Sequence, residues 1–168
     1  MNELPWFERE LTFGKSPELL PYFLERLEGT ILRIEKKVAG ISEANLSLRL
    51  NNKWSIKENI GHLAEVDEIA NKRIDEMVTG TEIMSPAVFE PQNYNPWPID
   101  KVVSFFRETR KKNLVKYLSL KQEHLLCASI HPRLKVKMTP VDLAWFDAEH
   151  DDHHLVKINL ILQSITKS

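Results

Sequence analysis

Apolar residues recur at three- and four-residue intervals along most of this chain, which has only five glycines. This spacing limits what the chain can fold into, because it places the apolar side chains on one face of a helix and does not suit a strand. In the range 21–38 the stripe consists of Phe23, Leu24, Leu27, Ile31, Ile34 and Val38. Further helices are predicted over 56–77, 99–118 and 140–165. Four helices of this length predict an all-α fold, a four-helix bundle.

Two of the predicted helices begin at recognisable residues. Ser55 and Glu58 match the capping box, in which each side chain accepts a hydrogen bond from the other residue's backbone N–H. Thr139 and Pro140 supply an N-cap followed by proline in the first helical position, and Asp142 adds an acid to the first turn. These signals place the starts of the second and fourth helices.

Length and charge restrict the domain organisation and the partners. We expect 168 residues to form a single domain (1–168), with an N-terminal leader (1–16) and a long loop marked by four prolines (81–98). A formal net charge of −1 argues against nucleic acid and anionic membrane as partners, and no apolar run approaches ~20 residues. A lone cysteine and an N-terminus without signal-peptide features predict a cytoplasmic protein.

The predicted fourth helix contains the segment DLAWFDAEHDDHHLVKINLIL (142–162), which is unusually rich in histidine and aspartate. On a helical wheel, Asp147, His150 and His154 share a stripe with the apolar residues Leu143, Phe146, Ile158, Ile161 and Ile165. Burying such polar groups without partners costs several kcal/mol each, so we expect something to satisfy them. His150 and His154 project to one side, whereas His153 is predicted to be exposed.

A third histidine, His62, lies in the first turns of the predicted second helix, where Gly61 permits a close approach of backbone or ligand. One histidine from one helix and an i,i+4 pair from another match the three protein ligands of a catalytic zinc-type site, with a fourth position open to water or substrate. We therefore predict that His62, His150 and His154 bind one divalent metal ion.

Four acids lie near these histidines in the pattern: Glu58, Glu65, Asp147 and Asp151. They are candidates for accepting hydrogen bonds from the histidines or for acting as a general base.

Two other interpretations of the same residues remain. The histidines could instead be hydrogen-bonded core-edge or exposed residues. Asp147-x-x-His150 also resembles half of a di-iron motif, but the matching half is reversed, as His62-x-x-Glu65, and the third helix offers only Glu108. A single ion is the better fit.

The segments WSIKENIGHL (54–63) and HDDHHLVKI (150–158) resemble the second and fourth helices of the DinB/YfiT-like superfamily. His131-Pro132, followed by Thr139-x-x-Asp142-Leu143, also falls where these proteins often carry such a turn. The resemblance covers roughly residues 20 to 165. It implies an up-down-down-up four-helix bundle, often a homodimer, that holds zinc or nickel through three histidines.

The activity that the resemblance implies is less specific. Some family members are S-transferases that use the low-molecular-weight thiols bacillithiol or mycothiol, one branch is a mycothiol-dependent isomerase, and many are described as metal-dependent hydrolases. The expectation is therefore an enzyme that acts on a small-molecule substrate by thiol transfer or hydrolysis. The alternatives are a non-catalytic metal-binding protein of the stress response and a DNA-damage factor, and the near-neutral charge opposes the second.

Overall fold

The computed structural model describes residues 4–90 and 92–166. Its helices are α1 (Leu20–Val38), the short α2 (Glu43–Leu46), α3 (Ile56–Val78), α4 (Ile99–Leu118) and α5 (Pro140–Thr166). A hairpin of two short antiparallel strands, β1 (Ser129–Ile130) and β2 (Lys137–Met138), precedes α5. The predicted all-α class and its four long helices are confirmed. None of the described helices combines the length and the apolarity that crossing a bilayer requires.

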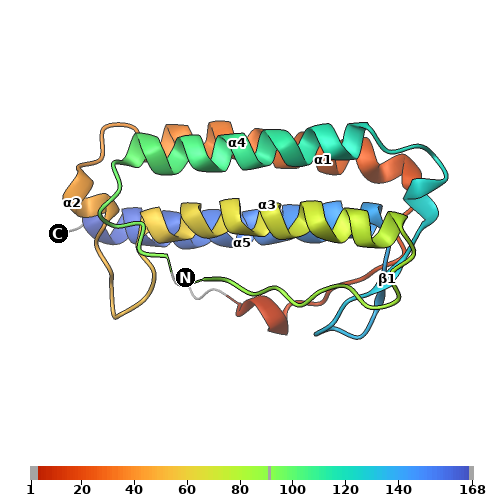
Figure 1. The fold of residues 1–168 in the computed structure, drawn as a ribbon. Helices are drawn as coiled ribbons and strands as arrows, with labels where there is room; N and C mark the ends of the chain where they lie inside the picture. Colours follow the sequence, from red (N-terminus) through yellow and green to blue (C-terminus); the bar gives the residue numbers. More distant parts are fainter. Residues whose placement is uncertain (1–3, 91, 167–168) are drawn as a thin grey trace.

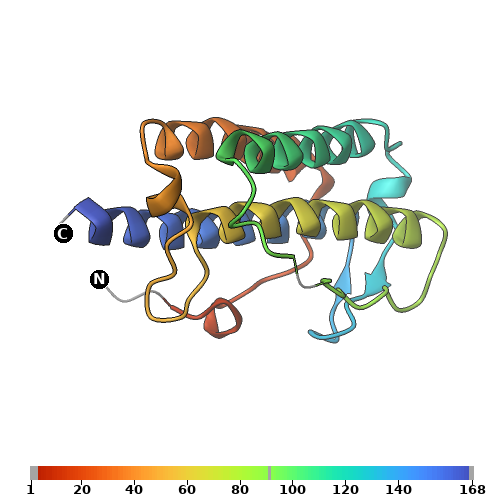
Figure 2. The same ribbon diagram turned by 60° about the vertical axis from the view of Figure 1, so that its left-hand side comes forward.

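The four long helices form two layers, with α1 and α4 in one layer and α3 and α5 in the other (Figure 1). Each helix of one layer packs against a helix of the other, α1 against α5 and α3 against α4. Helices α1 and α5 run in one direction and α3 and α4 in the opposite one, which is the up-down-down-up topology (Figure 1). Because α3 and α4 are parallel neighbours, the connection between them must return along the bundle. The proline-marked loop makes this crossover (Figure 2).

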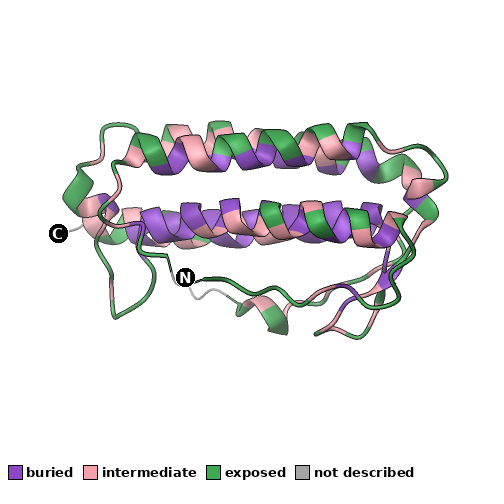
Figure 3. Ribbon diagram, in the orientation of Figure 1, coloured by how far each residue is buried: buried purple, intermediate pink, exposed green. Residues whose placement is uncertain are grey.

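The α3/α5 layer is covered on both faces. The α1/α4 layer covers one face, and the N-terminal leader, the proline-marked loop and the β1–β2 hairpin lie along the other (Figures 1 and 2). Figure 3 accordingly shows more buried residues along α3 and α5 than along α1 and α4. Side chains on the second face are therefore sheltered without belonging to the bundle core.

Both predicted helix starts are observed. The Ser55 hydroxyl accepts a hydrogen bond from the Glu58 N–H at 3.1 Å, and the Glu58 carboxylate accepts one from the Ser55 N–H at 2.8 Å. At the start of α5, the Thr139 hydroxyl and the Asp142 carboxylate exchange the same two bonds. The other oxygen of Asp142 accepts the Gly14 and Lys15 N–H groups, so this cap also attaches the leader.

A charged cluster joins all four long helices at the centre of the bundle. Arg110 of α4 is 1% exposed and lies between Asp67 of α3 and Asp151 of α5, with nitrogen–oxygen distances of 3.0 and 2.6 Å. Arg110 Nη1 also donates to the Leu27 carbonyl of α1 at 2.7 Å. Burial raises the pKa of Asp67 to about 7 despite the neighbouring guanidinium. One cation is therefore shared by two buried carboxyl groups.

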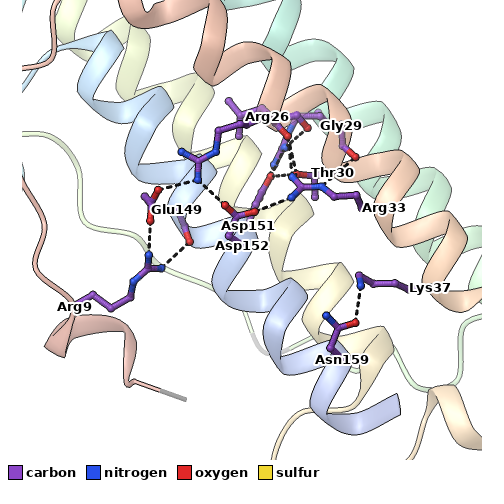
Figure 4. A network of polar contacts seen from close by, with 12 residues as sticks. Arg9, Arg26, Gly29, Thr30, Arg33, Lys37, Glu149, Asp151, Asp152 and Asn159 are labelled. Atoms are coloured by element: carbon purple, nitrogen blue, oxygen red, sulfur yellow. Dashed lines mark hydrogen bonds and ion pairs between the residues drawn. The ribbon is translucent and has the colours of Figure 1, made fainter. Parts of the chain in front are cut away.

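A second polar network lies at the edge of the α1–α5 contact (Figure 4). Arg26 of α1 contacts Glu149 at 2.8 Å and Asp152 at 2.6 Å, and Arg33 contacts Asp152 at 2.8 Å. Arg9 of the leader also pairs with Glu149 and donates to its backbone carbonyl at 3.0 Å. This network joins the leader to α1 through α5, directly beside the histidine-rich turns.

We predict that Arg110→Met lowers the free energy of unfolding by about 3–5 kcal/mol, because it leaves two buried carboxyl groups without their cation. Arg107→Met is the matched control on the same helix, since Arg107 makes an exposed ion pair with Glu35. The control should lose about 1 kcal/mol or less. Urea denaturation of both variants measures the difference, and equal losses would contradict a structural role for the cluster.

Candidate metal centre

His62 of α3 and His150 and His154 of α5 come together on the second face of the α3/α5 layer. One ring nitrogen of each lies within 4.8 Å of the other two. The Nε2 atoms of His150 and His154 are 3.2 Å apart. Two nitrogens bound to zinc at about 2.0–2.1 Å in a tetrahedron lie ~3.3 Å apart. The spacing of this pair therefore already suits a shared tetrahedral ion.

Asn59 determines which nitrogen of His154 carries hydrogen. Its amide nitrogen donates to the Ser55 carbonyl at 2.7 Å, so its oxygen faces His154 Nδ1, also at 2.7 Å. An amide oxygen can only accept, so Nδ1 of His154 donates and Nε2 keeps its lone pair. Sequence reasoning missed Asn59. Its position three residues before His62, on the same side of α3, is the signal that could have found it.

Glu65 lies beside His62, one turn further along α3, in a longer contact than that between Asn59 and His154. The Nδ1 atom of His62 lies 3.5 Å from Glu65 Oε2, and the Tyr94 hydroxyl donates to Glu65 Oε1 at 2.7 Å. The Tyr94 ring lies directly on Gly61, where a Cβ atom would come within 2.4 Å of it. The close approach predicted at Gly61 is thus made by a tyrosine of the proline-marked loop. This contact orients His62 from outside its own helix.

His150 and Asp147 have polar atoms that no described group satisfies. His150 Nδ1 and Asp147 Oδ2 are both buried without a hydrogen-bond partner. Burial raises the pKa of Asp147 well above its usual value, and Asp67 adds to the shift. Burial lowers the pKa of both His150 and His154 well below the usual value, with a contribution from the neighbouring histidines. At pH 7 both rings are neutral, which is the form that binds a metal ion.

The predicted acids separate into two groups. Glu65 contacts His62, and Asp147 lines the same cavity as His62 and His150. Asp151 instead pairs with Arg110 on the bundle side of α5. Glu58 is engaged by Arg49 and by its own helix cap. The structure therefore brings Glu65 and Asp147 to the histidines and directs Asp151 and Glu58 elsewhere.

The exposure predicted for His153 is wrong, and two further features of the surroundings do not follow from the helix pattern. The histidine stripe faces the leader and the loop, and Trp6 lies 5.0 Å from His150 between ring centroids. His153 is 8% exposed and not solvent-facing, because Trp6 also packs against it. Trp54 is 46% exposed and lies 4.8 Å from His62, so it forms a rim over the histidines and not part of the core. A helical wheel cannot show a covering layer made by other segments.

A cavity of about 610 Å³ lies beside the histidines, between α3, α5, the leader, the loop and the hairpin. Most of its lining is apolar or aromatic, including Trp6, Phe89 and Phe146. The polar lining residues are His62, Arg73, His131, Arg133, Asp147 and His150. Such a cavity, with apolar walls and a few placed polar groups, is typical of a small-molecule site.

Residues 26–158 match the family model of the DinB superfamily. The chain belongs to the DinB superfamily. Its fold is similar to that of YfiT from Bacillus subtilis, described as "a probable metal-dependent hydrolase with an unusual four-helix bundle topology". The TM-score is 0.81, at 15% sequence identity and with 94% of each chain covered, so the likeness concerns the fold. No curated protein sequence matches this chain.

We predict that this DinB-superfamily chain takes up about one equivalent of zinc or nickel and that His150→Ala loses it, because two imidazoles hold such an ion too weakly. His153→Ala is the control, since His153 lies on the same helix but outside the cluster. Elemental analysis of untagged protein measures both. Full occupancy in His150→Ala, or its loss in His153→Ala, would contradict this ligand set.

We further predict that Tyr94→Phe weakens zinc binding about 10-fold or more, because it removes the hydrogen bond that positions Glu65 behind His62. Tyr22→Phe is the control, since Tyr22 is 68% exposed on α1. Competition with a chromogenic chelator gives both affinities. An unchanged affinity in Tyr94→Phe would show that the loop does not support the site.

Proposed function

We propose that this chain is a metal-dependent hydrolase that acts on a small, largely apolar molecule. Three imidazole nitrogens within 4.8 Å of one another carry this proposal, and two of the three histidines, His62 and His150, line a cavity of about 610 Å³. An N₃ donor set suits zinc and nickel, and it leaves a coordination position for a ligand from the cavity. The description of YfiT as a probable metal-dependent hydrolase supports the same reaction class.

A divalent ion in such a site supplies a Lewis acid that lowers the pKa of a water or thiol in its open position. The chain's own residues do the rest. Asn59 and Glu65 hold the His154 and His62 rings in the orientation that a ligand needs. The buried Asp147 carboxyl lines the cavity and has an oxygen without a partner, so it would be the group that exchanges a proton with a ligand of the ion.

One further observation favours thiol S-transfer as the second candidate. A second hollow of about 720 Å³ adjoins the first, and Trp54 lines both. Lys53 and Lys157 lie in this second hollow, where they suit the carboxylates of a low-molecular-weight thiol. In that reaction the thiol would reach the histidines past Trp54, and the electrophile would occupy the apolar cavity.

We predict that zinc- or nickel-loaded protein hydrolyses a small activated ester, p-nitrophenyl butyrate, without added thiol. Asp147→Asn should keep its metal and lower kcat by about 10²–10⁴-fold, as expected for loss of a general acid–base group. Asp152→Asn, on the opposite side of α5, is the control and should keep both metal and turnover.

Turnover assays run with and without a thiol distinguish the hydrolase from the S-transferase. Turnover of an alkyl halide only when cysteine or a related thiol is present would favour the S-transferase and contradict the hydrolase. Metal-loaded protein that turns over neither the ester nor the alkyl halide would contradict both functions. It would favour a non-catalytic metal-binding bundle.

A further inference from the structure

The cavity beside the histidines contains a buried cation that the chain itself leaves almost unpaired. Arg73 of α3 is 6% exposed and lines this cavity. Its Nε atom has no hydrogen-bond partner, and its Nη2 atom makes only a 3.4 Å contact with the Ser85 carbonyl. Within residues 4–90 and 92–166, Arg73 makes no ion pair at 4.0 Å or less, and the Asp147 and Glu76 carboxylates act on its charge only from further away. Arg110, the other deeply buried arginine, has two carboxylate partners, and this contrast makes Arg73 unusual.

A buried guanidinium is costly unless an anion and hydrogen-bond acceptors compensate for the water that it has lost. Burial accordingly lowers the pKa of Arg73, although it stays charged at neutral pH. An oxyanion that enters the cavity would stabilise the buried Arg73 guanidinium, because the two N–H groups of its fork can bind a carboxylate in a bidentate arrangement.

His131 of the hairpin segment supplies a second donor to the same cavity. Its ring is 5% exposed, and its Nδ1 atom accepts the backbone N–H groups of Arg133 and Leu134 at 3.2 and 3.1 Å. The ring hydrogen is therefore on Nε2. Burial, reinforced by Arg73 and Arg133, lowers the pKa of His131 to about 4, so the ring is a neutral donor at pH 7. His131 and Arg73 line the same cavity.

The Asp147 charge interacts with Arg73 across the cavity, but the two side chains are not in contact. Asp147 lines the same cavity as Arg73 but makes no ion pair with it at 4.0 Å or less. Burial and the Asp67 charge raise the pKa of Asp147, whereas the Arg73 and Arg110 charges lower it. The Arg73 guanidinium and the His131 Nε2–H are therefore both free to bind an anion from the cavity.

We propose that Arg73 and His131 form an anion subsite that binds the carboxylate of an apolar carboxylic acid at the end of the cavity away from the histidines. Calling this acid a substrate depends on the proposed function, whereas the subsite itself does not. Arg73 follows His62 by eleven residues, ~16 Å along α3, and its side chain leans back toward the N-terminus. The ligand would thus carry its carboxylate on the order of 10 Å from its reacting bond.

The direct test compares two probes of equal shape, 4-phenylbutyrate and its uncharged amide 4-phenylbutyramide, by calorimetry on metal-free protein. The expected result is at least a tenfold tighter binding of the carboxylate to the wild type. Arg73→Gln should lose this preference and still bind one equivalent of metal. Arg107→Gln is the matched control, since Arg107 makes an exposed ion pair with Glu35 away from the cavity, and it should keep the preference.

Equal affinity for the two probes in the wild type, or no binding of the carboxylate at millimolar concentration, would overturn the subsite without any variant. Retention of the preference in Arg73→Gln would also overturn it. Tighter binding of hexyl phosphate than of hexanoate would replace the carboxylate by a phosphate as the ligand and contradict the proposal as stated. Because these titrations need no metal, a protein that prefers the carboxylate but binds no metal would support the subsite and contradict only the proposed hydrolase.

Discussion

The pairing of Arg110 with Asp67 and Asp151 is the interaction on which the rest of this structure depends. A buried guanidinium between two carboxyl groups tolerates little rotation or sliding of the helices that carry them. Asp151 follows His150 directly, so once Asp151 points into the bundle, His150 projects about 100° around α5 from it and faces the leader. The same cluster sets the rotation of α3 through Asp67, five residues after His62. The charged core thereby determines where the histidines can meet.

The histidines meet on a face that would be open to solvent in a simple four-helix bundle. The up-down-down-up topology changes this, because its crossover loop has to run back along the α3/α5 layer (Figure 2). The leader is attached to the same layer through Asp142 and Glu149. These segments supply Trp6, Phe89 and Tyr94, which enclose the cavity or support its histidines. Topology and site are therefore linked, because the loop that must join the parallel helices α3 and α4 also covers the histidines.

Local patterns in the sequence predicted the parts of this account that depend on neighbours along the chain. The helix ranges follow from apolar periodicity, the starts of α3 and α5 from their capping residues, and the cluster of His62, His150 and His154 from helical spacing. The burial of His153 and the rim position of Trp54 depend on which segments cover a helix, which a wheel does not contain. The pairing of Asp151 with Arg110 was missed for the same reason. An acid next to a histidine in sequence projects about 100° around the helix from it and can therefore face a different layer.

The most direct test of the central claim is X-ray absorption spectroscopy of the zinc-loaded protein, compared with His62→Ala. The account predicts three imidazole nitrogens and one further oxygen or nitrogen ligand at about 2.0–2.1 Å, with one imidazole lost or the ion released in the variant. A shell of oxygen ligands, or a spectrum that His62→Ala leaves unchanged, would contradict a three-histidine centre. The proposed chemistry would then lose its basis.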